Sequence, residues 1–301
     1  MRIAVAATPE VAIDSLNALQ SSDFDLAFVI TQPDRPAGRG QELKASTVSS
    51  WAVGAGVTCY KPESKEEFLK LAATVDLMIT IGYGKILTLD ELSAPTNGSI
   101  NLHFSLLPRW RGAAPVQRSI EAGDSVTGVT VFQLDEGMDT GPIYLMKRFA
   151  LDDDITSDEL FTELAEVGSE ALLESLAMIK SGVKPTPQSS TEMTKAAKIT
   201  KAEAEINWSD CAVDISRKIR AFTSNPGAWT TFRGSTLKIE APTIEEILLK
   251  PGEILYQDKK LLVGTSTTAI SLGFITPQGK SRTEAQSWVN GARLQPGELF
   301  G

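Results

Sequence analysis

The first half of the chain alternates short apolar runs with helical patterns, and this alternation constrains the fold more than any other feature of the sequence. Four apolar runs predict buried strands, at residues 3–7, 26–31, 77–81 and 99–103. Helical spacing between these runs predicts helices at residues 11–19 and 65–73. Because strands joined through helices pair in parallel, the pattern predicts an α/β fold with a doubly wound, Rossmann-like sheet.

Two further strands and a long helix are expected to complete this part of the chain. Residues 129–134 and 143–149 are apolar runs separated by one loop, so the two strands should pair with each other. Thr156, with Glu159 three residues later, has the sequence of a capping box that begins an amphipathic helix. The helix should end near Gly182, because glycine readily takes the left-handed conformation that follows a helix.

A polar stretch then separates a second, smaller domain. A chain of 301 residues is comfortable for two domains, and apolar periodicity disappears between the two parts. We therefore expect a first domain at residues 1–183, a linker at 184–204 and a second domain at 205–301. In the second domain, residues 215–222 should form a helix. Five short runs predict an OB-like β-barrel, at residues 229–232, 237–241, 252–256, 261–264 and 270–274.

Composition and missing motifs argue against several classes of protein. No run of about 18 apolar residues could span a bilayer. Cys59 and Cys211 are far apart, so neither a disulfide framework nor a cysteine zinc site is indicated. The sequence lacks both a P-loop and a G-x-S-x-G elbow. It also lacks the third glycine of the dinucleotide fingerprint, which argues against a nicotinamide enzyme. We expect a cytoplasmic protein.

The net charge of −9 argues against a general nucleic-acid binder, because such affinity comes from Lys and Arg on phosphates. The charge is unevenly spread, however. Residues 205–301 hold 11 Lys and Arg against 10 Asp and Glu, so the residues before them carry the acidic excess. A polyanion is therefore expected to favour the C-terminal part and local basic spots elsewhere.

Asn101 and His103 are the first candidates for chemistry. His103 is the only histidine, which excludes a His-rich metal site. If residues 99–103 form a strand, the two side chains share one face near its carboxyl end, where open α/β sheets bind ligands. Asp139 is the third candidate, since it lies in the loop at residues 135–141, whose glycines allow close backbone approach.

An amide, an imidazole and a carboxylate suit acyl transfer to an amine without a covalent enzyme intermediate. When a neutral amine attacks the acyl carbon, Asn101 and a protonated His103 can donate hydrogen bonds to the oxygen that becomes negative. Asp139 is expected to raise the pKa of His103 and to receive the amine proton, directly or through water. This chemistry requires no metal, and we expect none.

The same residues lie in two motifs that resemble the formyltransferase family. Residues 101–115, from Asn-Leu-His to Gly-Ala-Ala-Pro, resemble the family signature. Residues 137–141, Gly-Met-Asp-Thr-Gly, resemble the loop that brings the family's aspartate. The resemblance extends over nearly the whole chain, including the segment around Trp208 and residues 226–229. It implies three catalytic residues: Asn101, His103 and Asp139.

Within this family, the chain is most similar to the enzymes that act on methionyl-tRNA. The resemblance implies a Rossmann-like formyltransferase domain followed by a tRNA-binding OB-like barrel. It also implies transfer of the formyl group of 10-formyltetrahydrofolate to the α-amino group of methionyl initiator tRNA, which prepares N-formylmethionyl-tRNA for translation initiation. The folate co-substrate is expected at Ser105, Leu106, Leu107 and Pro108, and at Tyr83, Gly84 and Ile86. The tRNA is expected at Arg35, Arg39, Lys195, Lys198 and Arg217.

The loop at residues 32–40 favours tRNA as the acceptor. It is similar to the insertion that, in the family, contacts the acceptor end of initiator tRNA, and arginine suits that contact because its planar fork grips phosphate or stacks on bases. The sequence departs from the common family pattern at Ala7, at Phe104 and at Gln41-Glu42. The last departure stands where lysines are frequent, so it makes the loop less basic.

Three alternatives compete with this hypothesis. A formyltransferase for an amino sugar nucleotide shares the catalytic signature and a C-terminal barrel-like domain, but the loop at residues 35–40 favours tRNA. Glycinamide ribonucleotide formyltransferase lacks the second domain. A tRNA-binding scaffold on a retired enzyme fold would be supported by loss of a catalytic residue, and all three are present. We expect a monomeric bacterial enzyme.

Overall fold

The computed structural model describes residues 1–37, 42–189 and 191–301, and these residues form two compact units. Unit 1 comprises Met1–Pro115, Val126–Ala150 and Phe161–Ala196, and unit 2 comprises Val116–Ser125, Leu151–Leu160 and Ala197–Gly301. The chain therefore passes between the units several times, whereas the sequence pattern suggests a single crossing. Residues up to Ala196 of the expected linker belong to unit 1.

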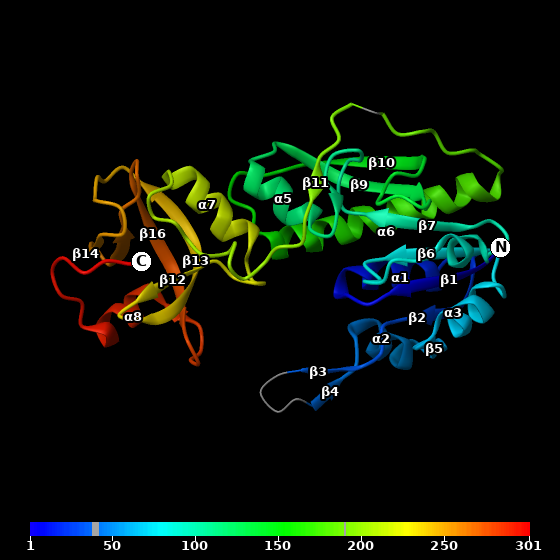
Figure 1. Ribbon diagram of the computed structural model, residues 1–301, viewed down its shortest axis with the longest axis horizontal. Helices are drawn as coiled ribbons and strands as arrows, with labels where there is room; N and C mark the ends of the chain where they lie inside the picture. Colours follow the sequence, from blue (N-terminus) through cyan, green and yellow to red (C-terminus); the bar gives the residue numbers. More distant parts are fainter. Residues whose placement is uncertain (38–41, 190) are drawn as a thin grey trace. The chain divides into compact units, whose positions relative to one another are not determined.

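A seven-stranded sheet forms the centre of unit 1, in the order β10-β9-β7-β6-β1-β2-β5 (Figure 1). The strands are β1 (Arg2–Ala7), β2 (Asp25–Ile30), β5 (Cys59–Tyr60), β6 (Leu77–Ile81), β7 (Ser99–His103), β9 (Val126–Gln133) and β10 (Ile143–Ala150). Strands β5, β2, β1, β6 and β7 run parallel, while β9 and β10 are antiparallel to their neighbours. The predicted doubly wound sheet is confirmed, and its strand order reverses between β1 and β6.

Helices accompany this sheet: α1 (Ile13–Gln20), α2 (Thr47–Ala55), α3 (Lys65–Ala72), α4 (Leu89–Ser93) and α6 (Ser157–Lys180), with a 3-10 turn (Glu10–Ala12) before α1. The predicted capping box begins α6. Thr156 donates its main-chain N–H and its hydroxyl to the Glu159 carboxylate, at 2.9 and 2.6 Å. Gly182 follows the helix with a φ of 81°, as predicted for its end.

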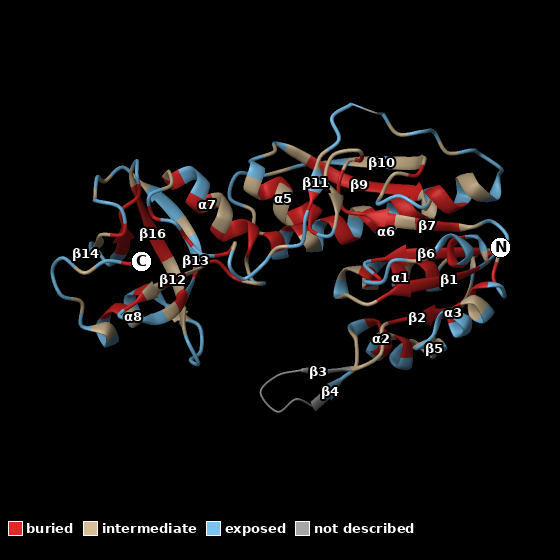
Figure 2. Cartoon of the chain, in the orientation of Figure 1, coloured by how far each residue is buried: buried red, intermediate tan, exposed pale blue. Residues whose placement is uncertain are grey.

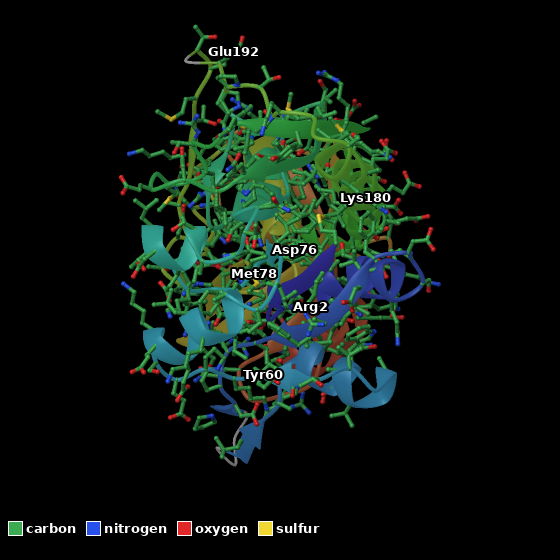
Figure 3. The ribbon with its side chains drawn as sticks, turned by 90° about the vertical axis from the view of Figure 1, so that its right-hand side faces the viewer. Arg2, Tyr60, Asp76, Met78, Lys180 and Glu192 are labelled. Atoms are coloured by element: carbon green, nitrogen blue, oxygen red, sulfur yellow. The ribbon has the colours of Figure 1, made fainter. Side chains whose placement is uncertain are left out.

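The middle of the sheet is buried, as Figure 2 shows for β1 and β6. One apolar cluster packs between the sheet and its helices: Ala4, Ala6, Phe28, Ile30, Phe68, Ala72, Val75, Met78 and Tyr83. The starts of β1 and β6 are also joined, because the main-chain N–H of Arg2 donates to the Asp76 carboxylate at 2.7 Å (Figure 3). These contacts hold β1 and β6 in place, and the candidate site lies at the carboxyl ends of the strands of this sheet.

Two short strand pairs lie outside the main sheet. β3 (Arg35–Ala37) pairs with β4 (Glu42–Lys44), and β3 lies within residues 32–40, the loop predicted to contact tRNA. Arg39 and Gln41 lie outside the described residues. β8 (Arg111–Gly112) pairs in parallel with β11 (Lys195–Ala196), which joins the segment after the catalytic signature to the expected linker.

Unit 2 is built on an antiparallel sheet, in the part of the chain where the sequence predicts a small OB-like β-barrel. Its strands are β12 (Trp229–Phe232), β13 (Ser235–Glu245), β14 (Ile254–Gln257), β15 (Lys260–Val263), β16 (Ala269–Pro277) and β17 (Thr283–Glu284). The C-terminal part of the chain adds the helix α7 (Ala212–Ala221), which was predicted, and the helix α8 (Ala285–Ala292), which was not. Its core contains Trp208, Phe232, Ile239 and Phe300.

Two segments from earlier in the chain complete unit 2. α5 (Pro115–Ala122) is joined to it by Arg118, whose Nη1 donates to the Glu203 carboxylate at 2.5 Å. Arg220 on α7 is buried and donates to the main-chain oxygen of Ile155 at 3.0 Å. These bonds explain why residues 116–125 and 151–160 group with the second unit. Among the described helices, none has the length and apolar character needed to cross a membrane.

Candidate active site

Asn101 and His103 lie on one face of β7. Side chains alternate along a strand, so both point to the face opposite Leu102. Leu102 packs on α6, where a Cβ added at Gly168 would lie 3.0 Å from Leu102 Cδ2. Asn101 and His103 therefore share the face of the sheet that points away from this contact, as the sequence predicts. Asn101 is half-buried, and His103 is only 5% exposed.

Thr80 fixes the orientation of the Asn101 amide. Thr80 lies on β6 directly beside Asn101, and its single hydroxyl hydrogen is directed to Asn101 Oδ1 at 2.8 Å, with the main-chain oxygen of Ile100 as a second, longer acceptor at 3.2 Å. An amide whose oxygen accepts a bond on one side presents its N–H groups on the other. Asn101 can therefore act as a hydrogen-bond donor toward a substrate oxygen.

His103 is held in one tautomer. Its Nε2 lies 2.9 Å from the main-chain oxygen of Trp110, and since a carbonyl oxygen can only accept, Nε2 carries the proton. Its Nδ1 faces Asp139, with 3.9 Å to Asp139 Oδ2, too far for a direct hydrogen bond. In the neutral ring, Nδ1 is therefore a basic nitrogen beside a carboxylate.

Burial lowers the pKa of His103 below its ordinary value, and the Asp139 carboxylate and the Trp110 carbonyl only partly offset this effect. The prediction that Asp139 raises this pKa is confirmed, but the prediction that the imidazolium is favoured is wrong, because burial outweighs the carboxylate. Removing a charged ring from water costs more than a carboxylate 3.9 Å away returns. The resting ring is neutral, which suits it to accept a proton.

Asp139 is anchored by β8. The main-chain N–H of Gly112 donates to Asp139 Oδ2 at 2.7 Å. Asp139 itself has a φ of 53°, in the left-handed region that costs about 1 kcal/mol for a residue with a side chain. Aspartate tolerates this conformation better than most residues. The carboxylate is thus turned from its loop toward His103 by a strained but anchored backbone.

Gly141, two residues after Asp139, is required at its position for a steric reason. A Cβ added at Gly141 would lie 1.8 Å from the main-chain oxygen of Gln133 in β9. Only glycine allows the loop to lie this close to the sheet. The prediction that glycines permit a close backbone approach here is confirmed.

The expected folate residues after β7 divide into buried and accessible ones. Ser105 and Leu107 are buried: the Ser105 hydroxyl donates to the main-chain oxygen of Arg109 at 2.7 Å, and the Leu107 N–H donates to Thr130 Oγ1 at 3.1 Å. Leu106 and Pro108 are half-buried. The buried Ser105 and Leu107 thus hold the turn in place, while Leu106 and Pro108 are partly accessible at the surface.

The expected folate residues after β6 divide in the same way. Tyr83 is buried against Phe68, and burial raises its pKa to about 12, so its hydroxyl stays protonated and its ring belongs to the core. Gly84 has a φ of 79°, and a Cβ there would meet nothing within 4 Å. Ile86 is 85% exposed. A pocket of about 330 Å³ adjoins this turn, lined by Thr8, Pro9, Gln32, Pro33, Lys44, Ser46, Gly82, Tyr83 and Gly84.

The expected tRNA residues are dispersed over both units. Arg35 begins β3, and Arg39 lies outside the described residues. Lys195 on β11 and Lys198 are exposed. Arg217 on α7 is half-buried: its guanidinium lies where a Cβ of Gly123 would stand, and its Nη1 is 3.9 Å from the Asp214 carboxylate.

Sequence reasoning missed two groups that shape the site, Thr80 and Gly112. The contact of Thr80 with Asn101 depends on the strand pairing, because the neighbour of Asn101 in a parallel sheet is known only once the register is known. Gly112 lies within the recognised signature, but its contact with Asp139 depends on two loops that meet only in three dimensions. The one signal available beforehand was that Thr80 is a polar residue within the apolar run at residues 77–81.

The site therefore offers an oriented amide donor, a neutral imidazole with one free ring nitrogen, and a carboxylate that can stabilise the imidazolium. Such a set can stabilise a developing oxyanion and move a proton between two nitrogens. Within the described part of the chain, no group of three or more His, Cys, Asp or Glu residues could hold a metal ion.

Two family comparisons cover most of the chain. Residues 1–176 match Formyl transferase, and residues 198–293 match Formyl transferase, C-terminal domain. The chain is 41% identical to the methionyl-tRNA formyltransferase of Streptomyces griseus subsp. griseus, and the match covers 100% of both chains.

Two solved structures share the fold. The methionyl-tRNA formyltransferase from Clostridium thermocellum has a TM-score of 0.60 at 18% identity, covering 81% of this chain and 94% of that one. HypX from Aquifex aeolicus, solved with tetrahydrofolic acid, has a TM-score of 0.66 at 19% identity over 96% of this chain. The chain spans about half of HypX, since the match covers 47% of it.

Proposed function

The chain belongs to the formyltransferase family, and from this membership we propose that it transfers the formyl group of 10-formyltetrahydrofolate to the α-amino group of methionyl initiator tRNA. The product, N-formylmethionyl-tRNA, serves translation initiation. One observation carries the chemistry: the basic Nδ1 of His103 lies 3.9 Å from Asp139 Oδ2, on the strand that also carries the oriented amide of Asn101. The full-length identity of 41% to a methionyl-tRNA formyltransferase supports the acceptor.

The three residues divide the work of the transfer. As the α-amino nitrogen bonds to the formyl carbon, Asn101 donates a hydrogen bond from Nδ2 to the oxygen that becomes negative. His103 takes the proton of the attacking amine at Nδ1 and returns it to the departing nitrogen. Asp139 stabilises the imidazolium between these two steps. One proton leaves the acceptor amine and one reaches the leaving amine, so the exchange balances without an external base.

10-Formyltetrahydrofolate supplies the formyl group, and the two loops beside the catalytic residues fit such a ligand. The open space at Gly84 lets a flat ring approach the backbone, and the exposed Ile86 gives it an apolar wall. Leu106 and Pro108 offer a second wall. The buried Ser105, Leu107 and Tyr83 hold these turns in shape.

We assign the tRNA contacts to five basic residues: Arg35, Arg39, Lys195, Lys198 and Arg217. Lys195 and Lys198 are exposed, so their ammonium groups can pair with phosphates. Residues 1–183 would then supply the catalytic domain, 184–204 the linker and 205–301 the tRNA-binding barrel. The enzyme is proposed to act as a monomer in the cytoplasm.

A comparison of acceptors tests this function. The purified chain is given 10-formyltetrahydrofolate with methionyl initiator tRNA, with methionyl elongator tRNA, or with an amino sugar nucleotide. Formylation of the initiator tRNA at a much higher kcat/KM than either other acceptor is expected. Transfer to the sugar nucleotide alone would keep the catalytic chemistry and overturn the assignment of tRNA.

A further inference from the structure

The segment that follows α6 contains Gln188, whose side chain bridges the loop of Asp139 and the strand β8. Its Nε2 donates to the main-chain oxygens of Asp139 and Gly141, at 2.9 and 2.7 Å. Its Oε1 accepts from Nε and Nη2 of Arg111, at 3.2 and 2.6 Å. Both ends of the amide are used, so its orientation is fixed by its partners.

These bonds close a ring around Asp139. Arg111 holds Gln188, Gln188 holds the main chain at Asp139, and the Asp139 carboxylate accepts the N–H of Gly112, the residue next to Arg111. The guanidinium also polarises the Gln188 amide, which strengthens its N–H bonds to the loop. The left-handed conformation of Asp139 is unfavourable on its own, so bonds from outside the loop must hold it.

Gln188 is itself set between two anchored points. On one side, Thr186 exchanges two main-chain hydrogen bonds with Ile143, at 2.7 and 2.8 Å. On the other side, Thr194 Oγ1 accepts the main-chain N–H of Trp110 at 2.9 Å. Trp110 is the residue whose carbonyl accepts from His103. The expected linker is therefore bonded to the main chain of Asp139 through Gln188 and to Trp110, the partner of His103, through Thr194.

We propose that Gln188 is a positioning residue for formyl transfer, which holds the Asp139 carboxylate at His103. The inference rests on the proposed function, because it assigns Gln188 a part in that reaction. Gln188 is bonded to the main chain of the loop, and its effect passes through Asp139. A shift of about 1 Å in a reacting constellation can cost a hundredfold in rate, so a freed loop should slow the chemical step.

Kinetics of two variants test the proposal. Gln188→Ala removes the whole bridge, whereas Gln188→Glu keeps an acceptor for Arg111 and loses both donors to the loop. For each, kcat should fall about tenfold or more while KM for the tRNA and for the folate changes less than twofold. Glu192→Gln is the matched control, because Glu192 is exposed on the same segment, at the top of Figure 3, and should keep full activity.

A double-mutant cycle separates positioning from general loss of structure. If Gln188 acts through Asp139, Gln188→Ala should add little to the loss caused by Asp139→Asn. The chain has one histidine, so the NMR titration of His103 gives a second readout that needs no substrate. Asp139 is the charged group that acts on His103, and Gln188→Ala should move the midpoint toward that of Asp139→Asn.

Two outcomes would overturn the proposal: folded Gln188 variants with normal kcat and an unchanged His103 titration, or losses in the double variant that simply add. Failure of the wild-type chain to formylate methionyl-tRNA would instead refute the proposed function. The titration would still decide in that case whether Gln188 holds Asp139.

Discussion

His103 shows how burial and charge compete at a single residue. The sequence places an aspartate near the histidine and suggests an imidazolium, but the ring is nearly enclosed, and burial lowers its pKa. A neutral resting ring can take the amine proton, whereas a charged one can only donate. In the proposed transfer, Asp139 stabilises the imidazolium that forms when the ring takes this proton.

Direct titration of His103 tests this assignment. In a chain made without a polyhistidine tag, the single histidine signal should titrate with a midpoint below about 6.5, the ordinary value for histidine. Asp139→Asn should lower the midpoint further, because it removes the group that raises it. A midpoint above the ordinary value in the wild type would restore the imidazolium as the resting form.

Thr80 should matter through the orientation of Asn101. Thr80→Val keeps the shape but removes the hydroxyl that donates to Asn101 Oδ1, so kcat should fall about tenfold, less than for loss of an oxyanion donor itself. Thr80→Ser should restore most of the rate. Thr127→Val is the control, since Thr127 is also buried but its hydroxyl has no partner among the described residues. Equal rates for both valine variants would show that Thr80 does not orient the amide.

At the scale of elements, the active site depends on how closely the Asp139 loop lies on β9. Gly141→Ala would place a Cβ 1.8 Å from the Gln133 carbonyl, so the backbone must move. We expect a loss of about 1–3 kcal/mol in the free energy of unfolding, together with a lower kcat. Chemical denaturation and steady-state assays measure the two effects.

Gly54→Ala is the matched control for that change. Gly54 lies in α2 with nothing within 4 Å of an added Cβ, so alanine there should stabilise the helix by about 0.5–1 kcal/mol and leave kcat unchanged. If Gly141→Ala behaved like Gly54→Ala, the loop would not be held against the sheet as described.

Elements with a strong local signal were predictable from the sequence. The central strands and α6 follow from apolar periodicity and a capping box, which act within a few residues of chain. The pairing of β8 with β11 and the helix α8 did not follow. The β8–β11 pair joins residues more than 80 positions apart. Its hydrogen bonds are made by the main chain, so no pattern of side chains in the sequence announces them.

The grouping of the three candidate catalytic residues was predictable from the sequence, and the residues that hold them in place were not. Asn101, His103 and Asp139 were named from strand alternation, loop glycines and a family resemblance. Thr80 and Gln188, which orient them, are ordinary polar residues until strand register and loop contacts bring them to the site. The protonation state of His103 was wrongly predicted, because burial cannot be read from sequence spacing.

At the scale of the whole molecule, the proposed tRNA contacts are basic residues spread over an acidic chain. With a net charge of −9, local cations must supply the attraction for phosphate. Replacing both Lys195 and Lys198, which are exposed, with alanine should raise KM for the tRNA several-fold and reduce its salt dependence. The kcat at saturating tRNA should stay the same, because neither side chain belongs to the catalytic cluster.

Lys184→Ala provides the comparison for this prediction, since Lys184 is exposed on the same expected linker but is not assigned to tRNA. Measurements of KM at several salt concentrations would distinguish the two. The same small change in both variants would mean that Lys195 and Lys198 are solvated charges without a role in tRNA binding.

Single-turnover formyl transfer from 10-formyltetrahydrofolate to methionyl initiator tRNA, with enzyme in excess, tests the central claim most directly. The wild-type chain should form N-formylmethionyl-tRNA, and His103→Ala, folded and still able to bind the folate, should do so at least about a hundredfold more slowly. Absence of product with the wild type, or equal rates for the two proteins, would contradict the account.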